Sequence, residues 1–179
     1  IGSEVCRQLL NFAPSKIVML DQSEFGIFQL EQEFQELRRS VSTALPPMEF
    51  LIEDITDEAA LQRVFMVNRP AVVFHAAAYK HVPLMEGNPL QALVVNTWGS
   101  AQLAELALEF GVQKFVQVST DKAVNPTNVM GASKRAAERY IQSLSNLGKT
   151  QFITTRFGNV LGSNGSVIPL FEEQIKNGG

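Results

Sequence analysis

The sequence predicts an α/β fold in which a doubly wound, mostly parallel sheet lies between two layers of helices, giving three layers in all. Strand-like and helix-like patterns alternate along the chain, and apolar runs of about five residues end in polar or glycine residues. Of the 179 residues, 45% are hydrophobic and 18% charged, which suits one globular domain with a sizeable core. Right-handed crossovers would place the carboxyl end of every strand at one edge of the sheet.

Each element follows from the spacing of its apolar residues. The first helix is amphipathic from the start of the chain, and the second carries Phe34 and Leu37 on its apolar side. The third helix has two candidate caps, Thr56 and Asp57. The strands are short apolar runs rich in Val, Ile and Phe. In order, the predicted elements are a helix over 1–10, a strand over 16–20, a helix over 25–39, a strand over 49–52, a helix over 57–68, a strand over 71–74, a helix over 89–110, a strand over 114–120, a helix over 133–147 and a strand over 151–155.

Charge and cysteine content limit the classes of function. Lys and Arg number 15 against 18 acidic residues, so the net charge of −3 provides no basic field for nucleic acid or anionic lipid. A single cysteine, Cys6, excludes an internal disulfide and a cysteine metal cluster, and it agrees with a reducing cytoplasm. With two histidines, no metal site is expected. No apolar run reaches the roughly 18 residues that cross a bilayer, and Glu4 and Arg7 interrupt any signal peptide.

The most informative stretch is the end of the fourth predicted strand. Ser119, Thr120, Asp121 and Lys122 deliver hydroxyls, a carboxylate and an amine in succession, and Lys134 follows at the start of a helix. Polar groups at strand ends of an α/β chain are where ligands bind and chemistry occurs. The alternative is a polar loop in which Asp121 and Lys122 form a surface ion pair.

The first half of the chain has features of a dinucleotide site. Asp21 directly follows a strand, where an acidic residue accepts hydrogen bonds from the adenosine ribose and repels the extra phosphate of NADP, which favours NAD. Gly2 begins a helix whose N–H groups would face a pyrophosphate, although an ordinary helix-start glycine is the alternative. Two other candidate cofactor contacts also have structural alternatives. Asp54 as a helix cap is one, and ordinary packing of the alanines at 76–78 is the other. The expected cofactor contacts in this half are Gly2, Asp21, Ser23, Asp54, Ile55, Ala76, Ala77 and Ala78.

Both ends of the chain predict that it is an internal piece of a longer protein. It begins within a helix, with no preceding strand, and it closes on Asn177, Gly178 and Gly179, a helix stop with nothing after it. We therefore interpret residues 1–179 as a dinucleotide-binding domain that lacks its first strand and a C-terminal substrate region.

Five motifs stand in a characteristic order, at residues 75–83, Asn96, 119–122, 130–134 and 156–160. In this order and at these spacings the chain resembles the extended short-chain dehydrogenase/reductase superfamily, whose domains are Rossmann-like. The phrase Ser-Thr-Asp-Lys-Ala-Val-Asn-Pro-Thr-Asn-Val-Met-Gly-Ala-Ser-Lys-Arg is similar to that of the UDP-N-acetylglucosamine 4,6-dehydratases of bacterial capsule, lipopolysaccharide and glycan synthesis. The resemblance covers essentially the whole chain.

The resemblance implies a reaction with bound NAD as cofactor and a UDP-N-acetylhexosamine as substrate. Hydride leaves C4 of the sugar, a base removes the C5 proton, the C6 hydroxyl departs as water, and hydride returns to C6. The product is a 4-keto-6-deoxy sugar nucleotide. Such chemistry needs an acid near the C6 hydroxyl, a base near C5 and a group that handles the C4 hydroxyl.

The same resemblance implies the catalytic roles. Asp121 would protonate the departing hydroxyl, Lys122 would be the base at C5 and Thr120 would assist at the C4 hydroxyl. Lys134 would hold the nicotinamide ribose and lower neighbouring pKa values by its charge. Met130 stands where the superfamily usually has its catalytic tyrosine, and it resembles the longer, membrane-attached forms. Because methionine cannot carry a proton, a retired site that only binds nucleotide is the competing interpretation.

Several further residues carry weaker expectations. His75 ends an apolar strand and is predicted to be a buried structural histidine. The resemblance adds Asn96, Ser119 and Lys134 to the cofactor contacts, and it implies substrate contacts at Lys80, His81, Asn159 and Ser163. His81 as an ordinary loop residue and Asn96 as a satisfied polar helix residue are the alternatives.

The alternatives to a dehydratase are an NAD-dependent nucleotide-sugar 4-epimerase, a 5-epimerising dehydratase and a non-catalytic nucleotide-binding module. The resemblance implies a homo-oligomer formed through the helices over 89–110 and 133–147. It also implies a cytoplasmic location, as the cytoplasmic domain of an inner-membrane protein in the longer form. A membrane would then be contacted only through regions outside this chain, and no nucleic-acid partner is expected.

Overall fold

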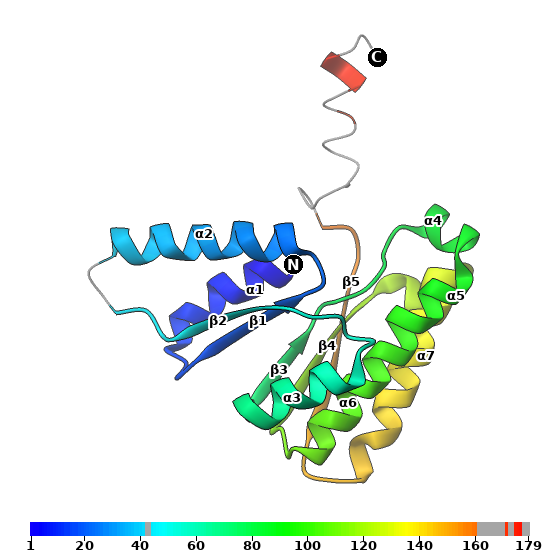
Figure 1. Cartoon of the computed structure of the whole chain (residues 1–179). Helices are drawn as coiled ribbons and strands as arrows, with labels where there is room; N and C mark the ends of the chain where they lie inside the picture. The colour runs from blue at the N-terminus through cyan, green and yellow to red at the C-terminus, as the bar shows by residue number, and fades with distance from the viewer. Residues whose placement is uncertain (42–43, 161–170, 172–173, 177–179) are drawn as a thin grey trace.

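The structure, a computed structural model, describes residues 1–41, 44–160, 171 and 174–176. Within this part, strands and helices alternate, and every strand pairing is parallel, which confirms the predicted α/β class (Figure 1). No helix in these ranges is long and apolar enough to cross a membrane.

The strands form two hydrogen-bonded groups rather than one continuous sheet. One group pairs β1 with β2, and the other has the order β3-β4-β5. Their registers place Asp21 beside Ile52 and Thr120 beside Phe157, so the carboxyl ends within each group lie together as predicted. No pairing joins the two groups among the described residues. The strands are β1 Ile17–Asp21, β2 Met48–Ile52, β3 Val72–His75, β4 Lys114–Thr120 and β5 Gln151–Phe157.

The helices lie on two sides of the strands, with α1 and α2 on one side and α3, α6 and α7 on the other (Figure 1). The α-helices are α1 Gly2–Leu9, α2 Glu24–Ser40, α3 Glu58–Asn68, α4 Val82–Gly87, α5 Pro89–Ala92, α6 Ser100–Glu109 and α7 Val129–Ser143. A π-helical segment covers Leu93–Gly99, and short 3₁₀ segments cover Leu10–Phe12, Asp121–Ala123 and Leu144–Asn146.

The two faces of β1 bury separate apolar clusters. Ile17 and Met19 pack with Phe34 of α2, while Leu20 packs against the larger cluster around Leu61 and Phe115. This alternation follows from the period of two along a strand. Because both faces of β1 are covered, the doubly wound arrangement predicted from the sequence is present in the structure.

Helix α7 begins four residues earlier than predicted. Its N-cap is Asn128, whose side-chain oxygen accepts a hydrogen bond from the backbone N–H of Gly131 at 2.7 Å. Asparagine is a favoured cap, so the signal was present in the sequence, but the predicted start at residue 133 was wrong. The consequence is functional, because Met130 and Lys134 both lie on α7 itself.

The predicted helix over 89–110 is also more complex than expected. Its middle widens into the π-helical segment Leu93–Gly99, and a further helix, α4, precedes it. A Cβ at Gly99 would lie 2.9 Å from side-chain atoms of Ile55, so any larger residue there would force the Ile55 side chain to shift. Widened turns of this kind occur often at functional sites, and this one carries Asn96.

Candidate active site

The end of β4 brings four predicted site residues into one hydrogen-bonded cluster. The Thr120 hydroxyl donates to Oδ1 of Asp121 at 2.9 Å, and the Lys122 ammonium donates to the same oxygen at 3.1 Å. Lys122 also donates to the side-chain oxygen of Asn159 at 3.5 Å. The backbone N–H of Lys122 bonds to the Thr120 hydroxyl at 3.3 Å, which tightens the 3₁₀ turn. A hydroxyl, a carboxylate and an amine therefore meet where β4 ends beside β5.

These groups face solvent in this chain. The side chains of Asp121 and Lys122 are 56% and 36% exposed. Hydrogen bonds from Thr120 and Lys122 hold the pKa of Asp121 below its ordinary value. As it stands, Asp121 is an ionised acceptor. To act as an acid it must be desolvated, which a bound substrate would do by covering it.

Helix α7 places Met130 and Lys134 beside this cluster. A Cβ at residue 131 would collide with the backbone carbonyl oxygen of Lys122, so Gly131 lets the first turn of α7 pack against the turn that carries Asp121. The Met130 side chain is buried in a small apolar cluster with Met85 and Ala92. At this position the structure thus contains a packed apolar group.

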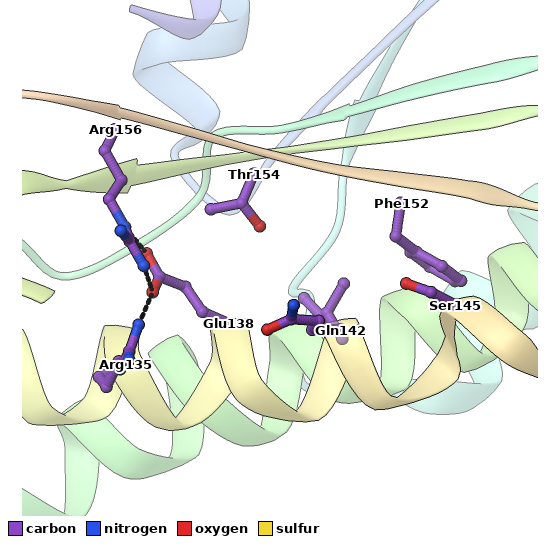
Figure 2. A pocket seen from close by; sticks show the side chains of 8 residues that line it. Arg135, Glu138, Gln142, Ser145, Phe152, Thr154 and Arg156 are labelled. Carbon is purple, nitrogen blue, oxygen red and sulfur yellow. Dashed lines mark hydrogen bonds and ion pairs between the residues drawn. The ribbon is translucent and has the colours of Figure 1, made fainter. Parts of the chain in front are cut away.

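Lys134 is a buried cation, with 4% of its surface exposed. Burial lowers its pKa to about 8, and the nearby carboxylate of Glu138 opposes that shift. Glu138 lies one turn further along α7 and is also 4% exposed. Its carboxylate points toward Arg135 and Arg156 (Figure 2). The sequence pattern alone does not single out Glu138, and its only signal is its position four residues after Lys134.

Asn96 holds three segments together around the site. Its amide nitrogen donates to the backbone carbonyl of Tyr79 at 2.9 Å and to the Ser133 hydroxyl at 3.0 Å, and its oxygen accepts from the Tyr79 N–H at 2.8 Å. Both amide donors are therefore used within the protein. This arrangement supports the satisfied-polar alternative for Asn96 and leaves its amide no free donor for a cofactor.

His75 is the buried structural histidine that the sequence predicts. Its Nε2 lies 2.7 Å from the Ser100 hydroxyl, which itself donates to the Asn96 backbone carbonyl. That hydroxyl has one proton, so Nε2 of His75 is the donor in the first bond. Burial, and to a smaller extent the charge of Lys134, lowers the pKa of His75 to about 3.

This depressed pKa predicts a specific acid sensitivity. Between about pH 6.5 and pH 3 the unfolded chain binds a proton at His75 and the folded chain does not, so stability falls as the pH falls. Each pH unit in this window removes up to about 1.4 kcal/mol. We expect His75→Gln to have a flatter dependence of the unfolding free energy on pH, measured by urea denaturation. His81→Gln, at the exposed second histidine, is the control, and equal slopes in both variants would contradict the assignment.

The cofactor side brings Gly2 and Ala76 together. A Cβ at Gly2 would lie 3.9 Å from that of Ala76, so the start of α1 faces the small residues after β3. Asp21 ends β1, and its carboxylate accepts from the Ser23 N–H at 2.9 Å. The Ser23 hydroxyl caps α2 through the Gly26 N–H, so it serves a structural purpose in this chain.

Other predicted contacts are placed but not tested. Asp54 accepts hydrogen bonds from the N–H and hydroxyl of Thr56, while Asp57 caps α3, and the Ile55 side chain lies in the main apolar core. Lys80 and His81 are exposed, at the start of α4. The residues assigned to cofactor or substrate that stay predictions are Gly2, Asp21, Ser23, Asp54, Ile55, Ala76, Ala77, Ala78, Lys80, His81, Asn96, Ser119, Lys134 and Asn159. Ser163 lies outside the described residues. In the part of the chain that the structure describes, no three or more His, Cys, Asp or Glu residues are grouped so that they could hold a metal ion.

Comparison with known sequences gives consistent matches. A family model described as polysaccharide biosynthesis protein matches residues 1–179. The capsular polysaccharide biosynthesis protein CapD of Staphylococcus aureus is 49% identical over all of this chain and 29% of that protein. The UDP-N-acetylglucosamine 4,6-dehydratase (inverting) of Campylobacter jejuni is 35% identical, over 95% of this chain and 48% of its own length. A UDP-glucose 4-epimerase of Rickettsia canadensis is 38% identical, over 95% of this chain and 50% of its own length.

Solved structures give the same picture of the fold. Pen from Bacillus thuringiensis superposes with a TM-score of 0.86 at 34% identity, covering 99% of this chain and 54% of that one. DesIV, a dTDP-glucose 4,6-dehydratase from Streptomyces venezuelae with NAD bound, has a TM-score of 0.79 at 22% identity, covering 99% and 59%. This chain spans from 29% to about half of the length of these curated relatives.

Proposed function

The chain belongs to the polysaccharide biosynthesis protein family, and we propose that the complete protein carries out NAD-dependent 4,6-dehydration of a UDP-N-acetylhexosamine, with UDP-N-acetylglucosamine as the first substrate to test. Its curated relatives include nucleotide-sugar dehydratases and epimerases, so modification of a nucleotide sugar is the shared chemistry. The observation that carries the finer proposal is the hydrogen-bonded cluster of Thr120, Asp121 and Lys122, with Met130 at the neighbouring helix turn.

The residues of this chain fit a dinucleotide. The start of α1 at Gly2 and the small side chain of Ala76 leave room for a pyrophosphate near helix N–H groups. The carboxylate of Asp21 lies at the end of β1, where it would accept hydrogen bonds from the hydroxyls of a ribose. The buried ammonium of Lys134 supplies a positive charge on the adjoining helix. Bound NAD would supply the hydride acceptor and donor of the reaction.

The chain's own groups would then handle the protons. The ionised Asp121 carboxylate would take the proton of the C4 hydroxyl through the hydroxyl of Thr120, which is hydrogen-bonded to it. Lys122, in its neutral amine form, would take the proton from C5. Asp121 gives a proton to the C6 hydroxyl, which leaves as water. Asn159, which contacts Lys122, orients the amine toward the sugar. Covering of this cluster by the sugar would raise the pKa of Asp121 from its present low position.

Met130 favours dehydration over epimerisation. A tyrosine hydroxyl can carry the C4 proton by itself, but the packed thioether of Met130 cannot. The proton must then be handled by the cluster at the end of β4, which holds both an acid and a base. Nucleotide-sugar 4-epimerisation stays the second candidate because a 4-epimerase is among the relatives at 38% identity.

Mass spectrometry separates these two reactions. The complete protein is incubated with UDP-N-acetylglucosamine and NAD, and the nucleotide-sugar product is weighed. Dehydration lowers the mass by one water, whereas epimerisation leaves it unchanged. A product of unchanged mass but different sugar configuration would contradict the dehydratase and support the epimerase. Bound NAD without any product would support the nucleotide-binding module.

An apolar face on the helices supports a homo-oligomer. Leu93, Val94, Trp98 and Tyr140 lie around a hollow of about 630 Å³, and Trp98 is 60% exposed. Exposed apolar side chains in one patch mark association surfaces, and a two-fold axis would let this face cover its own copy.

We also propose that the domain lies in the cytoplasm and is joined to a membrane only through regions outside this chain.

We expect Trp98→Glu to convert the oligomer into monomers. Burying a carboxylate against the apolar partner face is unfavourable, so the dissociation constant should rise by at least about 100-fold, as for a central interface residue. Sedimentation velocity of the complete protein measures the change. Val67→Glu, at an exposed apolar residue of α3 outside this face, is the matched control. An unchanged oligomer in Trp98→Glu would exclude this face as the interface.

A further inference from the structure

Glu138 is a buried carboxylate whose place in the fold the reaction above does not use. It is 4% exposed and lies between α7 and β5, where Figure 2 shows it pointing toward two guanidinium groups. Arg156 of β5 donates to both carboxylate oxygens, at 2.9 and 2.7 Å, and Arg135 donates to one of them at 3.3 Å. A fork-to-fork pair of this kind fixes position and charge together.

The Glu138–Arg156 pair joins the two segments that carry the site. Lys134 lies one turn before Glu138 on α7, and Asn159 lies three residues after Arg156 beyond β5. Side chains four residues apart on a helix are neighbours, so Glu138 is placed to act on the buried ammonium of Lys134. Without a nearby negative charge, a buried ammonium tends to lose its proton.

The elements packed around α7 carry other charged groups. They are Asp121 and Lys122 on the 3₁₀ turn, Glu86 on α4, Glu105 on α6 and Arg156 on β5, with Arg135 on α7 itself. The neutral His75 on β3 also interacts with Lys134. Burial lowers the pKa of Lys134, and the negative charge of Glu138 raises it. Burial raises the pKa of Glu138, but hydrogen bonds, chiefly from Arg156, together with the charge of that guanidinium outweigh burial and hold the pKa below its ordinary value, so Glu138 stays ionised.

We propose that Glu138 is a positioning residue that keeps Lys134 protonated for cofactor binding, and that Arg156 limits this effect by partly neutralising the carboxylate. The functional part of the inference rests on the proposed role of Lys134 at the nicotinamide ribose. The electrostatic part does not, because the protonation of Lys134 can be measured with no ligand present.

Two substitutions are expected to shift the titration midpoint of Lys134 in opposite directions. Glu138→Gln removes the negative charge and leaves both guanidinium groups, so the titration midpoint of Lys134 should fall by about one pH unit or more. Arg156→Gln removes a positive charge and leaves the carboxylate less neutralised, so the midpoint should rise. A clamp that only held α7 against β5 would be loosened by both changes, and both midpoints would move in the same direction.

Carbon-13 NMR of the lysine Cε resonances of the complete protein reports the midpoint. The Lys134 signal is identified by its loss in Lys134→Arg, and the parent midpoint is expected near pH 8. Glu36→Gln, which removes one exposed carboxylate from α2, is the matched control and should leave the midpoint unchanged. Shifts of opposite sign support the inference, while shifts of equal sign or none overturn it. If Glu138→Gln fails to fold, Arg156→Gln decides alone, since an unchanged or lowered midpoint overturns the inference.

A second readout separates this inference from the proposed function. The dissociation constant of NAD, measured by calorimetry across pH, should increase on the alkaline side at the pH where Lys134 loses its proton. In Glu138→Gln this increase should begin at a pH lower by the same shift that NMR records. If NMR shows the opposed shifts but NAD affinity ignores them, the effect of Glu138 on Lys134 stands and the proposed cofactor role of Lys134 fails.

Discussion

Replacing Lys122 with Ala, or Asp121 with Asn, is expected to abolish measurable turnover of the complete protein while NAD still binds. Each change removes a proton-transferring group from the cluster at the end of β4. General acid–base catalysis contributes about 10²–10⁴-fold for each positioned group, so kcat should fall by at least that factor. Release of the dehydrated sugar nucleotide, followed by mass spectrometry, measures the rate.

The fold should survive both substitutions. Asp121 and Lys122 are exposed, and exposed ion pairs contribute little to stability. The melting temperature and the NAD dissociation constant should therefore stay close to those of the parent. Lys114→Ala, at the exposed end of β4 opposite to the cluster, also removes a lysine and should keep full activity. A normal rate in Lys122→Ala would mean that another group is the C5 base.

Replacing Lys134 with Met is expected to stabilise the fold while weakening NAD binding. Burial holds the pKa of Lys134 near 8, against an ordinary value of 10.5. At neutral pH the folded protein thus keeps a charged group that its surroundings disfavour. A difference of this size corresponds to roughly 3 kcal/mol of unfolding free energy. The methionine side chain keeps the apolar stem and removes the charge, so the variant should regain about that amount.

The stability that Lys134→Met gains over the parent protein should depend on pH. Between about pH 8 and pH 10.5 the unfolded chain holds a proton on Lys134 that the folded chain has lost, so the parent gains stability as the pH rises. The advantage of Lys134→Met should be complete below about pH 8 and vanish by about pH 10.5. Urea denaturation at a series of pH values measures it. A variant less stable than the parent at pH 7, or an advantage that persists at pH 10.5, would contradict the account.

The fold was largely predictable because each element had a strong local signal. The apolar runs that became β1 to β5 were short and bounded by polar residues, and α2 and α3 followed from apolar spacing and capping. The start of α7 was missed because Ser133 and Lys134 were taken as the first turn, whereas Asn128 caps the helix. The π-helical segment was not predicted, and Gly99 at its end packs against Ile55, a distant residue that no local pattern reveals.

The catalytic cluster was predictable because it is contiguous in sequence, from Thr120 to Lys122. The Glu138–Arg156 pair was not, since its members lie on different elements and meet only when α7 packs on β5. No pairing joins β1 to β3 among the described residues, and a further strand between them stays a prediction.

Proton NMR in heavy water tests the proposed chemistry most directly. The complete protein is supplied with UDP-N-acetylglucosamine and a catalytic amount of NAD, and the sugar signals are followed. The account predicts a new C6 methyl signal, a keto group at C4 and deuterium entering at C5, because Lys122 exchanges the proton that it removes there. Lys122→Ala should show none of these changes. A sugar that stays unaltered in the parent, with NAD bound, would contradict the dehydratase and identify Met130 as the mark of a site that only binds nucleotide.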